Sequence, residues 1–234
     1  MTALNVPPSQ PIPPLEPGDH LTRAEFERRY RAMPHVKKAE LIEGVVHMPS
    51  PVRWRNHSFP HVHVNAWLSA YWARTPGVVP GDNPSLRLDL ENEPQPDATL
   101  LILPTYGGRV RISADDYVEG APEWVGEVAA SSSSFDLHTK LRVYRRNQVQ
   151  EYFVWRVLDQ AIDWFVYREG QYEPLGPGAD GILRSEAFPG LWLDPAAMAA
   201  FDLTRVLAVL QEGLKSPDHS AFVTRLEQAA SAQP

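Results

Sequence analysis

The chain has 234 residues, of which 43% are hydrophobic, and it carries a formal net charge of -7 at pH 7. This length and apolar content are sufficient for one main domain with a substantial core. The absence of cysteine excludes disulfides, thiolate zinc sites and a cysteine nucleophile. Because affinity for nucleic acid comes mainly from Lys and Arg that neutralise phosphates, the acidic balance restricts any nucleic-acid role to a local basic patch.

The ends of the chain differ in character from its middle. Residues 1–20 are rich in proline and lack apolar periodicity, which predicts an extended or disordered leader. We expect the main domain over residues 21–200 and a C-terminal helical extension over residues 201–234. No apolar run approaches the roughly 20 residues that cross a bilayer, and no basic segment followed by an apolar one opens the chain. These features, with the absence of cysteine, predict a cytoplasmic protein without a membrane partner.

The first elements expected along the chain are a helix, a strand and a second helix. Thr22 is a plausible N-cap and Glu25 follows three residues later, the spacing of a capping box. The segment 39–48, AELIEGVVHM, predicts a strand with a bend at Gly44. Residues 61–74 then show the apolar periodicity of an amphipathic helix.

The second half of the domain is richer in strands. Residues 84–104 predict a hairpin whose second strand begins at Asp97. A strand over 122–130, a helix over 135–148 and two or three antiparallel strands over 150–175 follow. This order predicts an α/β (α+β) domain in which helices flank a mixed β-sheet.

A carboxylate interrupts the apolar strand PEWVGEVAA. Side chains alternate along a strand, so Glu127 shares one face with Val125 and Ala129. Burial among such neighbours costs several kcal/mol unless the carboxylate is paired, hydrogen-bonded or bound to a cation. Glu127 therefore needs a partner.

The helix that follows offers a cation on its inward side. At 3.6 residues per turn, Leu137, Val143 and Tyr144 flank the direction of Lys140. One interpretation is an internal salt bridge between Glu127 and Lys140 that holds helix to sheet.

Asp97 suggests a second interpretation. It follows a proline that cannot lie inside a sheet, so we expect it at a sheet end where ligands enter, unless it only caps a local amide. Asp97 and Glu127, with a main-chain carbonyl such as that of Val128, would form the oxygen cage that Mg²⁺ or Mn²⁺ prefers. With Lys140 beside the cage to orient or deprotonate a water, the arrangement suits hydrolysis of phosphodiesters.

Several segments, in order, carry a family resemblance: AELIEGVVHM, then His57, QPDATLL, PEWVGEVAASSSSFDLHTKLRVYRRNQVQEYFVW and FPGLWLD. They resemble the Uma-type family of restriction-endonuclease-like proteins, within the PD-(D/E)xK nuclease superfamily, over roughly residues 21–200. The resemblance implies a restriction-endonuclease-like fold, a Mg²⁺ or Mn²⁺ cofactor and hydrolysis of DNA by an endonuclease.

The resemblance also implies roles for particular residues. Asp97 and Glu127 match the family's acids, Lys140 its helix-borne lysine, and Glu40 a further ligand or water-positioning acid. His57 matches a recurring histidine, an auxiliary residue whose role the residues do not define. The superfamily's usual lysine, two positions after the strand acid, is replaced here by a small residue, Ala129, which leaves room for Lys140.

Other features admit more than one interpretation. The arginines Arg142, Arg145, Arg146, Arg53 and Arg55 predict either a surface that contacts phosphates or merely solvated faces. His57 and His61 have the spacing of a helical zinc pair but lack a third ligand in sequence, whereas Trp124, Trp155 and Trp164 predict core packing.

A non-catalytic binding or regulatory module is the alternative to a nuclease. If the protein cuts duplex DNA, two sites are needed, which predicts a homodimer.

Overall fold

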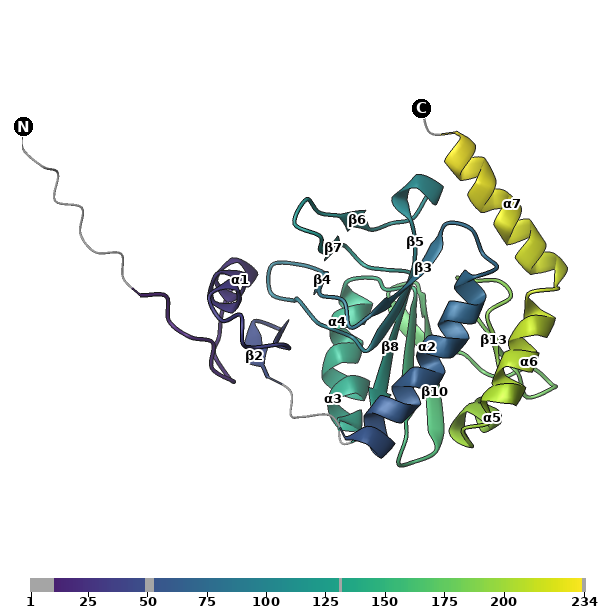
Figure 1. Cartoon of the computed structure of the whole chain (residues 1–234), viewed down its shortest axis with the longest axis horizontal. Coiled ribbons are helices and arrows are strands. Elements are labelled where there is room, and N and C mark those ends of the chain that lie inside the picture. The colour runs from purple at the N-terminus through teal and green to yellow at the C-terminus, as the bar shows by residue number, and fades with distance from the viewer. Residues whose placement is uncertain (1–10, 49–52, 131, 233–234) are drawn as a thin grey trace, which may run out of the picture.

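The computed structural model describes residues 11–48, 53–130 and 132–232 (Figure 1). At its centre lies a six-stranded sheet in the order β11-β10-β9-β8-β5-β3. Its strands are β3 (Val78–Asp82), β5 (Ala98–Ile102), β8 (Trp124–Ala129), β9 (Glu151–Arg156), β10 (Ala161–Arg168) and β11 (Gln171–Pro174). β8 and β9 are parallel and the other neighbours are antiparallel, so the sheet is mixed as predicted.

The helices cover both faces of this sheet. They are α2 (Phe59–Trp72), the short segments α3 (Ser133–Phe135), η3 (Asp136–Lys140) and α4 (Leu141–Arg146), and the later α5 (Pro195–Ala199), α6 (Leu203–Gly213) and α7 (Pro217–Ser231). Trp67 of α2 and Val206 of α6 pack with Trp124 on one face, whereas Tyr144 of α4 packs with Val125 on the other. Because both faces are covered, all six residues of β8 are buried.

The C-terminal helices belong to the same core. Phe222 and Leu226 of α7 and Leu210 of α6 lie in the buried cluster that contains the three tryptophans of the sheet. Trp124, Trp155 and Trp164 are at most 2% exposed, which confirms the prediction that they pack in the core. Among the described residues no helix is long and apolar enough to cross a membrane.

A small N-terminal lobe lies at the opposite end of the molecule from α7 (Figure 1). It consists of α1 (Arg23–Arg31) and a hairpin of β1 (Glu40–Ile42) and β2 (Val45–His47). Leu15, Phe26 and Leu41 form its core. Leu41 exchanges two main-chain hydrogen bonds with Glu93, of 3.1 and 2.8 Å, which fastens the lobe to the sheet domain.

Several predicted elements are confirmed. Thr22 Oγ1 accepts from Glu25 N–H at 3.4 Å, so α1 begins as the capping spacing predicts. The helix over 61–74 corresponds to α2, and the antiparallel strands over 150–175 are β9, β10 and β11. The segment 39–48 is a hairpin rather than one bent strand, because Glu43 and Gly44 both adopt positive φ angles, 52° and 75°, typical of a tight turn.

The hairpin predicted over 84–104 is wrong. β4 (Leu86–Arg87) pairs in parallel with β7 (Val118–Glu119), which in turn pairs with β6 (Arg111–Ile112), whereas β5 pairs with β3 and β8. Local periodicity cannot show that the second strand has a better partner in β3. β3 itself was not predicted because it contains Pro80 and Gly81, which an edge strand tolerates.

The remaining described elements are short. They are η1 (Trp54–Ser58), η2 (Pro104–Tyr106), β12 (Leu183–Arg184) and β13 (Trp192–Leu193). Of the predicted leader, residues 1–10 lie outside the described residues. In its described part, Leu15 is only 3% exposed and Gly18 N–H donates to Val46 at 2.9 Å, so residues 11–20 contact the N-terminal lobe.

Candidate active site

Glu127 lies in the middle of β8 with its carboxylate turned toward the helix that follows. Its side chain is 4% exposed. Oε1 accepts from Lys140 Nζ and from Tyr144 Oη, both at 2.9 Å. The predicted inward direction of Lys140 is therefore observed, and Tyr144, one helical turn later, lies on the same side.

Lys140 joins the sheet domain to the N-terminal lobe. Its Nζ lies 2.9 Å from Glu40 Oε1 in β1 as well as 2.9 Å from Glu127. Glu40 Oε1 also accepts from Gln95 N–H at 2.8 Å. Lys140 ends η3, a π-helical turn, a rare conformation that occurs often at functional sites. The amine thus sits between two carboxylates rather than in solvent.

Asp97 lies just before β5, beside the chain that leaves Glu127. Its Oδ2 accepts from Val128 N–H at 2.8 Å and lies 3.1 Å from His57 Nε2. Its Oδ1 is 3.6 Å from Lys38 Nζ, a side chain of the N-terminal lobe. Proline before the aspartate keeps this position outside the ladder, as predicted.

The carbonyl of Val128 lies on the edge of β8 that faces Asp97. In an extended strand the N–H and C=O of one residue face the same side, and the Val128 N–H donates to Asp97. The next carbonyl, that of Ala129, faces the other way and accepts from Val157 at 3.0 Å. Because β5 pairs with β8 only as far as Gly126, the Val128 carbonyl lies beyond that ladder.

This region holds more acid than base. Acidic groups outnumber ammonium groups here by two: Glu40, Asp97, Glu127 and Asp136 against Lys38 and Lys140. Burial raises the pKa of Glu127 to about 8, and neighbouring acids add to the rise while Lys140 opposes it. Burial likewise raises the pKa of Asp136. A bound divalent cation would favour the ionised forms of these acids.

Asp97 and Lys140 are shifted toward their charged forms. Burial acts to raise the pKa of Asp97, but the hydrogen bond from His57, the charge of Lys38 and the Val128 amide together hold it well below its usual range. Burial acts to lower the pKa of Lys140, but its acidic neighbours hold it well above its usual value. Lys140 is therefore a permanent cation at neutral pH.

The donor set suits a hard divalent ion only when the main chain contributes. The described residues contain no group of three His, Cys, Asp or Glu side chains arranged to hold a metal. Asp97, Glu127 and the Val128 carbonyl instead offer three oxygen donors, and Mg²⁺ and Mn²⁺ prefer oxygen. The chemistry of these donors, two carboxyl groups and a main-chain carbonyl, fits such an ion.

The predicted zinc pair has a different arrangement. His57 Nε2 contacts the side chain of Asp97, whereas His61 Nε2 lies 2.6 Å from the main-chain oxygen of Asp97 and 3.2 Å from Asp82 Oδ1. The two ring nitrogens thus contact different atoms rather than converge on one point. Both histidines orient Asp97, a role typical of supporting residues.

The predicted arginines divide into two groups. Arg142 lies 3.3 Å from Glu43, Arg145 donates to Gln171 at 2.7 Å, and Arg146 lies 3.6 Å from Asp89. Arg53 and Arg55 are exposed next to His57, and no carboxylate lies within ion-pair distance of either among the described residues. The second group is the more available to a phosphate.

Three residues of the site were not predicted as members of it. Lys38 lies just before the predicted strand and before β1, so strand alternation gave no signal for it. Asp136 lies one helical turn before Lys140, and Tyr144 one turn after it. The signal that Asp136 and Tyr144 share is helical spacing from Lys140, not their own chemistry.

Comparisons with known proteins identify a family and a similar fold. The sequence matches the family described as "Putative restriction endonuclease" (Uma2) over residues 23–196. A search of curated protein sequences gives no match. The fold is similar to a crystal structure from Anabaena variabilis ATCC 29413 described as a "putative nuclease belonging to DUF820". Its TM-score is 0.52 at 14% identity, and the match covers 78% of this chain and 97% of that one. That likeness shows a shared fold.

The family match begins with α1 and ends in α5, so it includes both the lobe that carries Glu40 and the sheet that carries Glu127. It spans well over half of the chain. The chain belongs to the Uma2 family, described as putative restriction endonucleases.

Proposed function

We propose that this protein is a Mg²⁺- or Mn²⁺-dependent endonuclease that hydrolyses phosphodiester bonds in DNA. One observation carries the proposal: the buried ammonium of Lys140 lies 2.9 Å from the carboxyl groups of both Glu40 and Glu127, and Asp97 is among the acids close enough to raise the pKa of Glu127. Family membership supports a nuclease. The DNA substrate and the metal are the finer parts of the proposal.

Asp97, Glu127 and the carbonyl of Val128 would hold the ion. When bound, a divalent ion polarises a phosphoryl oxygen and makes an adjacent water more acidic. Oδ1 of Asp97 is the available oxygen of that carboxylate, because Oδ2 already accepts from Val128 and contacts His57.

Lys140 supplies a fixed positive charge. Because its acidic neighbours raise its pKa, Lys140 stays protonated at neutral pH and acts as a hydrogen-bond donor rather than a base. A protonated amine at this position orients a water and stabilises the charge that develops on the phosphoryl oxygens. Tyr144 and Glu40 fix the position of Glu127 and Lys140 respectively.

His57 positions Asp97. Its Nε2 lies 3.1 Å from Asp97 Oδ2, and its side chain is 21% exposed, so it lies at the rim of the site. Exposed Arg53 and Arg55 precede it by four and two residues and would contact DNA phosphates. Arg142, Arg145 and Arg146 would add a weaker phosphate-contacting surface because each already has a protein partner.

Cleavage by matched variants tests the proposal. Purified protein is incubated with plasmid and linear DNA in Mg²⁺ or Mn²⁺, beside Asp97→Ala and Lys140→Ala. We expect cleavage by the native chain, none after chelation with EDTA, and a loss of roughly a hundredfold or more in each variant. Equal activity in all three proteins would defeat the assignment, provided that their thermal unfolding shows each is folded.

A second function, a non-catalytic binding or regulatory module, is favoured by one observation. Glu127 and Asp97 already have internal cationic partners, Lys140 and Lys38, so the cluster also serves as a bridge between lobe and sheet. Calorimetry with Mn²⁺ separates the two functions. The absence of binding, or binding that Glu127→Gln leaves unchanged, would favour the module.

Assembly and location remain predictions of the sequence. Cutting both strands of a duplex needs two sites, so we propose a homodimer. Light scattering coupled to size-exclusion chromatography measures its mass directly. Location in the cytoplasm is proposed from the absence of cysteine, which is typical of proteins from reducing compartments but does not require one.

A further inference from the structure

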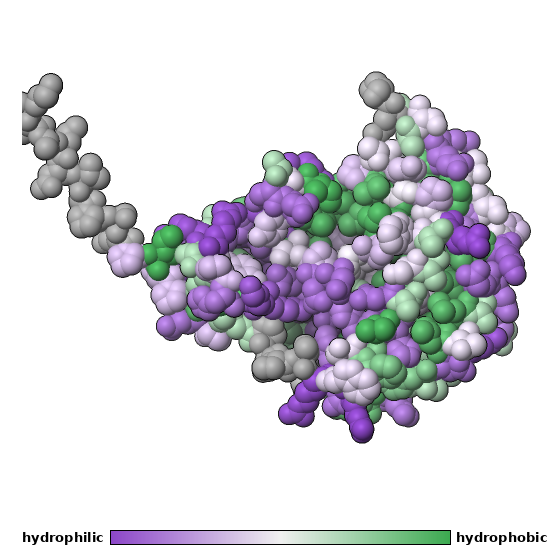
Figure 2. All heavy atoms as spheres, viewed as in Figure 1, coloured by the Kyte–Doolittle hydropathy of each residue, from purple (hydrophilic) through white to green (hydrophobic). Residues whose placement is uncertain are grey.

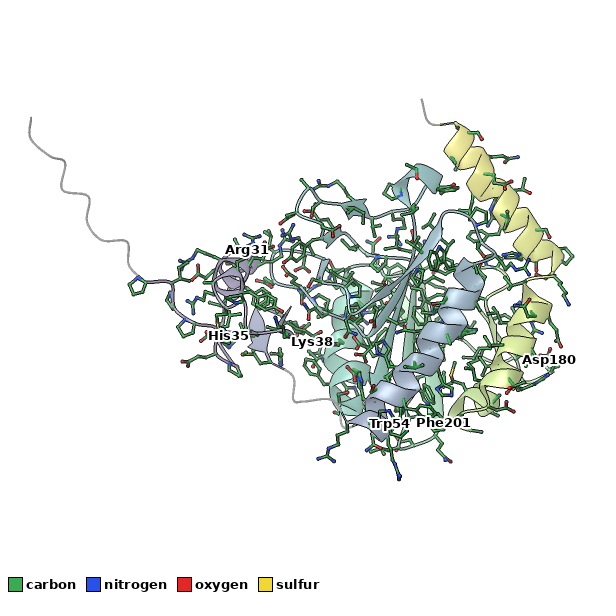
Figure 3. The ribbon with its side chains drawn as sticks, in the orientation of Figure 1. Arg31, His35, Lys38, Trp54, Asp180 and Phe201 are labelled. Carbon is green, nitrogen blue, oxygen red and sulfur yellow. The ribbon has the colours of Figure 1, made fainter. Side chains whose placement is uncertain are left out.

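An exposed tryptophan stands at the rim of the candidate active site. Trp54 opens the π-helical turn η1 and is 65% exposed, the second highest exposure among the large apolar side chains described. Trp54 and Phe201 lie together where α2 begins (Figure 3). Figure 2 shows hydrophilic side chains projecting beside apolar surface at this end of the molecule. Trp54 stacks on Phe59, which is itself 36% exposed, so the two rings form one exposed aromatic patch, a feature of interaction sites.

A column of aromatic rings holds this indole in place. Trp54 stacks on Phe59 with centroids 5.2 Å apart and planes 25° apart. Phe59 stacks on Phe201 at 5.4 Å, and Phe201 contacts the fully buried Trp155 at 5.3 Å. The column extends from the surface into the core of the sheet domain. One face of the indole is therefore supported, and its large exposed fraction leaves the other face open.

The open face is flanked by positive charge. Arg53 and Arg55, the residues on either side of Trp54, are both exposed. In the part of the chain that the structure describes, neither has a carboxylate within 4.0 Å, unlike Arg142 or Arg146. Two unpaired guanidinium groups beside an aromatic face match a ligand that combines a flat ring with negative charge.

A single turn of chain, η1, connects Trp54 to the candidate active site. His57, which contacts Asp97 at 3.1 Å, lies three residues after Trp54 in the same π-helical turn. The wide turn directs His57 inward to Asp97 while Trp54 and Phe59, five residues apart, stack on one side. A ligand stacked on Trp54 thus lies within one turn of chain of the residue that contacts Asp97.

We infer that Trp54, Arg53 and Arg55 form a subsite for single-stranded DNA, in which an unpaired base stacks on the indole and the adjoining phosphates contact the arginines. The inference rests on the proposed function for its substrate. Within a duplex, neighbouring base pairs cover the faces of each base, so only an unstacked base can lie on Trp54. The protein therefore prefers single-stranded segments, frayed ends or flaps to intact duplex.

The aromatic column reduces the conformational entropy that is lost when a base binds to Trp54. Because Phe59 and Phe201 already hold the indole, little side-chain freedom is lost when a base stacks on it. The arginines give a salt-dependent attraction to the backbone, and the indole distinguishes single strands from duplex. The two contributions can be separated by mutation.

The chain provides a matched control at the other end of α2. Trp72 is 51% exposed, and the exposed Arg74 follows it two residues later. This pair has the same chemistry as Trp54 with Arg53 and Arg55, but the 14-residue helix α2 separates it from His57. Neither Trp54 nor Trp72 is buried, so replacing either one spares the core.

Binding of a fluorescently labelled oligothymidine, followed by anisotropy in EDTA, tests the inference without requiring metal or cleavage. We expect Trp54→Ala to weaken binding about tenfold, Trp54→Phe to weaken it about twofold, and Trp72→Ala to leave it unchanged. We also expect the native chain to bind the oligothymidine more tightly than a duplex of the same length. Equal affinity of Trp54→Ala and Trp72→Ala would overturn the subsite, as would tighter binding to duplex.

The arginines are tested by salt dependence. Arg53→Gln combined with Arg55→Gln is expected to reduce the slope of log affinity against log salt by about one to two units, whereas Arg74→Gln leaves it unchanged. An identical slope in all three proteins would overturn the phosphate role. Since none of these measurements involves hydrolysis, loss of cleavage with the Trp54 effect intact would refute only the nuclease. Cleavage without a Trp54 effect would refute only the subsite.

Discussion

Two buried carboxylates on neighbouring strands, Glu127 of β8 and Glu151 of β9, are satisfied in opposite ways. Glu151 accepts from four neutral groups, the amides of Glu186 and Ala187, Ser185 Oγ and Trp164 Nε1, at 2.6 to 3.1 Å. Glu127 accepts from the cation Lys140 and from Tyr144 among further acids.

The two carboxylates also lie on opposite faces and toward opposite ends of the paired strands. Glu151 is opposite Trp124 in the parallel ladder, and Glu127 is opposite Val154, three positions further along. Alternation then turns Glu151 toward the tryptophan cluster and Glu127 toward α4. A network that is complete with neutral donors stabilises the fold, whereas one with surplus charge is suited to bind a charged ligand.

The largest expected difference between Glu127 and Glu151 concerns the rate of DNA cleavage. Glu127→Gln is expected to lower the rate of DNA cleavage roughly a thousandfold, because it removes the charge of a proposed metal ligand. Stability should change little, since Lys140 keeps Glu40 and Asp136 as counter-charges. Glu151→Gln is the matched control and should cleave at the native rate. Equal loss of activity in both variants would contradict the assignment of Glu127 to the site and of Glu151 to the fold.

The converse effect concerns folding. Glu151→Ala leaves two amides, a hydroxyl and an indole N–H unpaired in the core, so the free energy of unfolding should fall by about 4 kcal/mol. Urea denaturation at slightly acidic pH measures the loss. A reduction below about 1 kcal/mol would mean that water replaces the carboxylate and that the network is not structural.

Titration of Glu151 gives an intermediate effect. Burial raises the pKa of Glu151 from 4.5 to about 7, although four hydrogen bonds oppose the rise. The folded protein therefore holds this proton more tightly than the unfolded chain. The resulting stabilisation, about 3 kcal/mol at most, is complete below pH 4.5 and is lost as the pH rises through about 7.

Comparison with Glu151→Gln isolates this contribution. The amide keeps an oxygen that can accept from the two main-chain amides but does not titrate in this range. The native chain should therefore lose stability relative to the variant between pH 4.5 and about 7, as chemical denaturation at several pH values will report. Parallel stability curves for the two proteins would contradict the raised pKa.

The smallest effect concerns the arginines on the helix behind Lys140. Arg142 already pairs with Glu43 at 3.3 Å, so binding phosphate requires it to leave a protein partner. Arg142→Gln should weaken binding of DNA by less than about threefold, a loss measurable by anisotropy. A tenfold loss would mean that the surface that contacts DNA lies on α4 rather than on η1. It would also contradict the view that the paired arginines of α4 serve mainly the fold.

Local spacing was sufficient to predict the parts of the site that lie within one element. The inward direction of Lys140 follows from helical periodicity, and the isolation of Glu127 follows from strand alternation. The capping box at Thr22 likewise marked the start of α1. Each depends on residues within a few positions of one another.

Contacts between distant segments could not be predicted in the same way. The pairing of β5 with β3 instead of β4, and the approach of Lys38 to Asp97, depend on how separate elements meet. The exposure of Trp54 depends on a π-helical turn whose stacking on Phe59 does not follow from ordinary helical spacing. An apolar residue in an expected loop gave no signal of a surface role.

Calorimetric titration with Mn²⁺ tests most directly the claim that the surplus acid around Lys140 binds a divalent ion. The account predicts that the native chain and Glu151→Gln bind Mn²⁺ with the same affinity, and that Glu127→Gln binds it at least about tenfold more weakly. No binding by the native chain, or equal binding by all three proteins, would contradict the account.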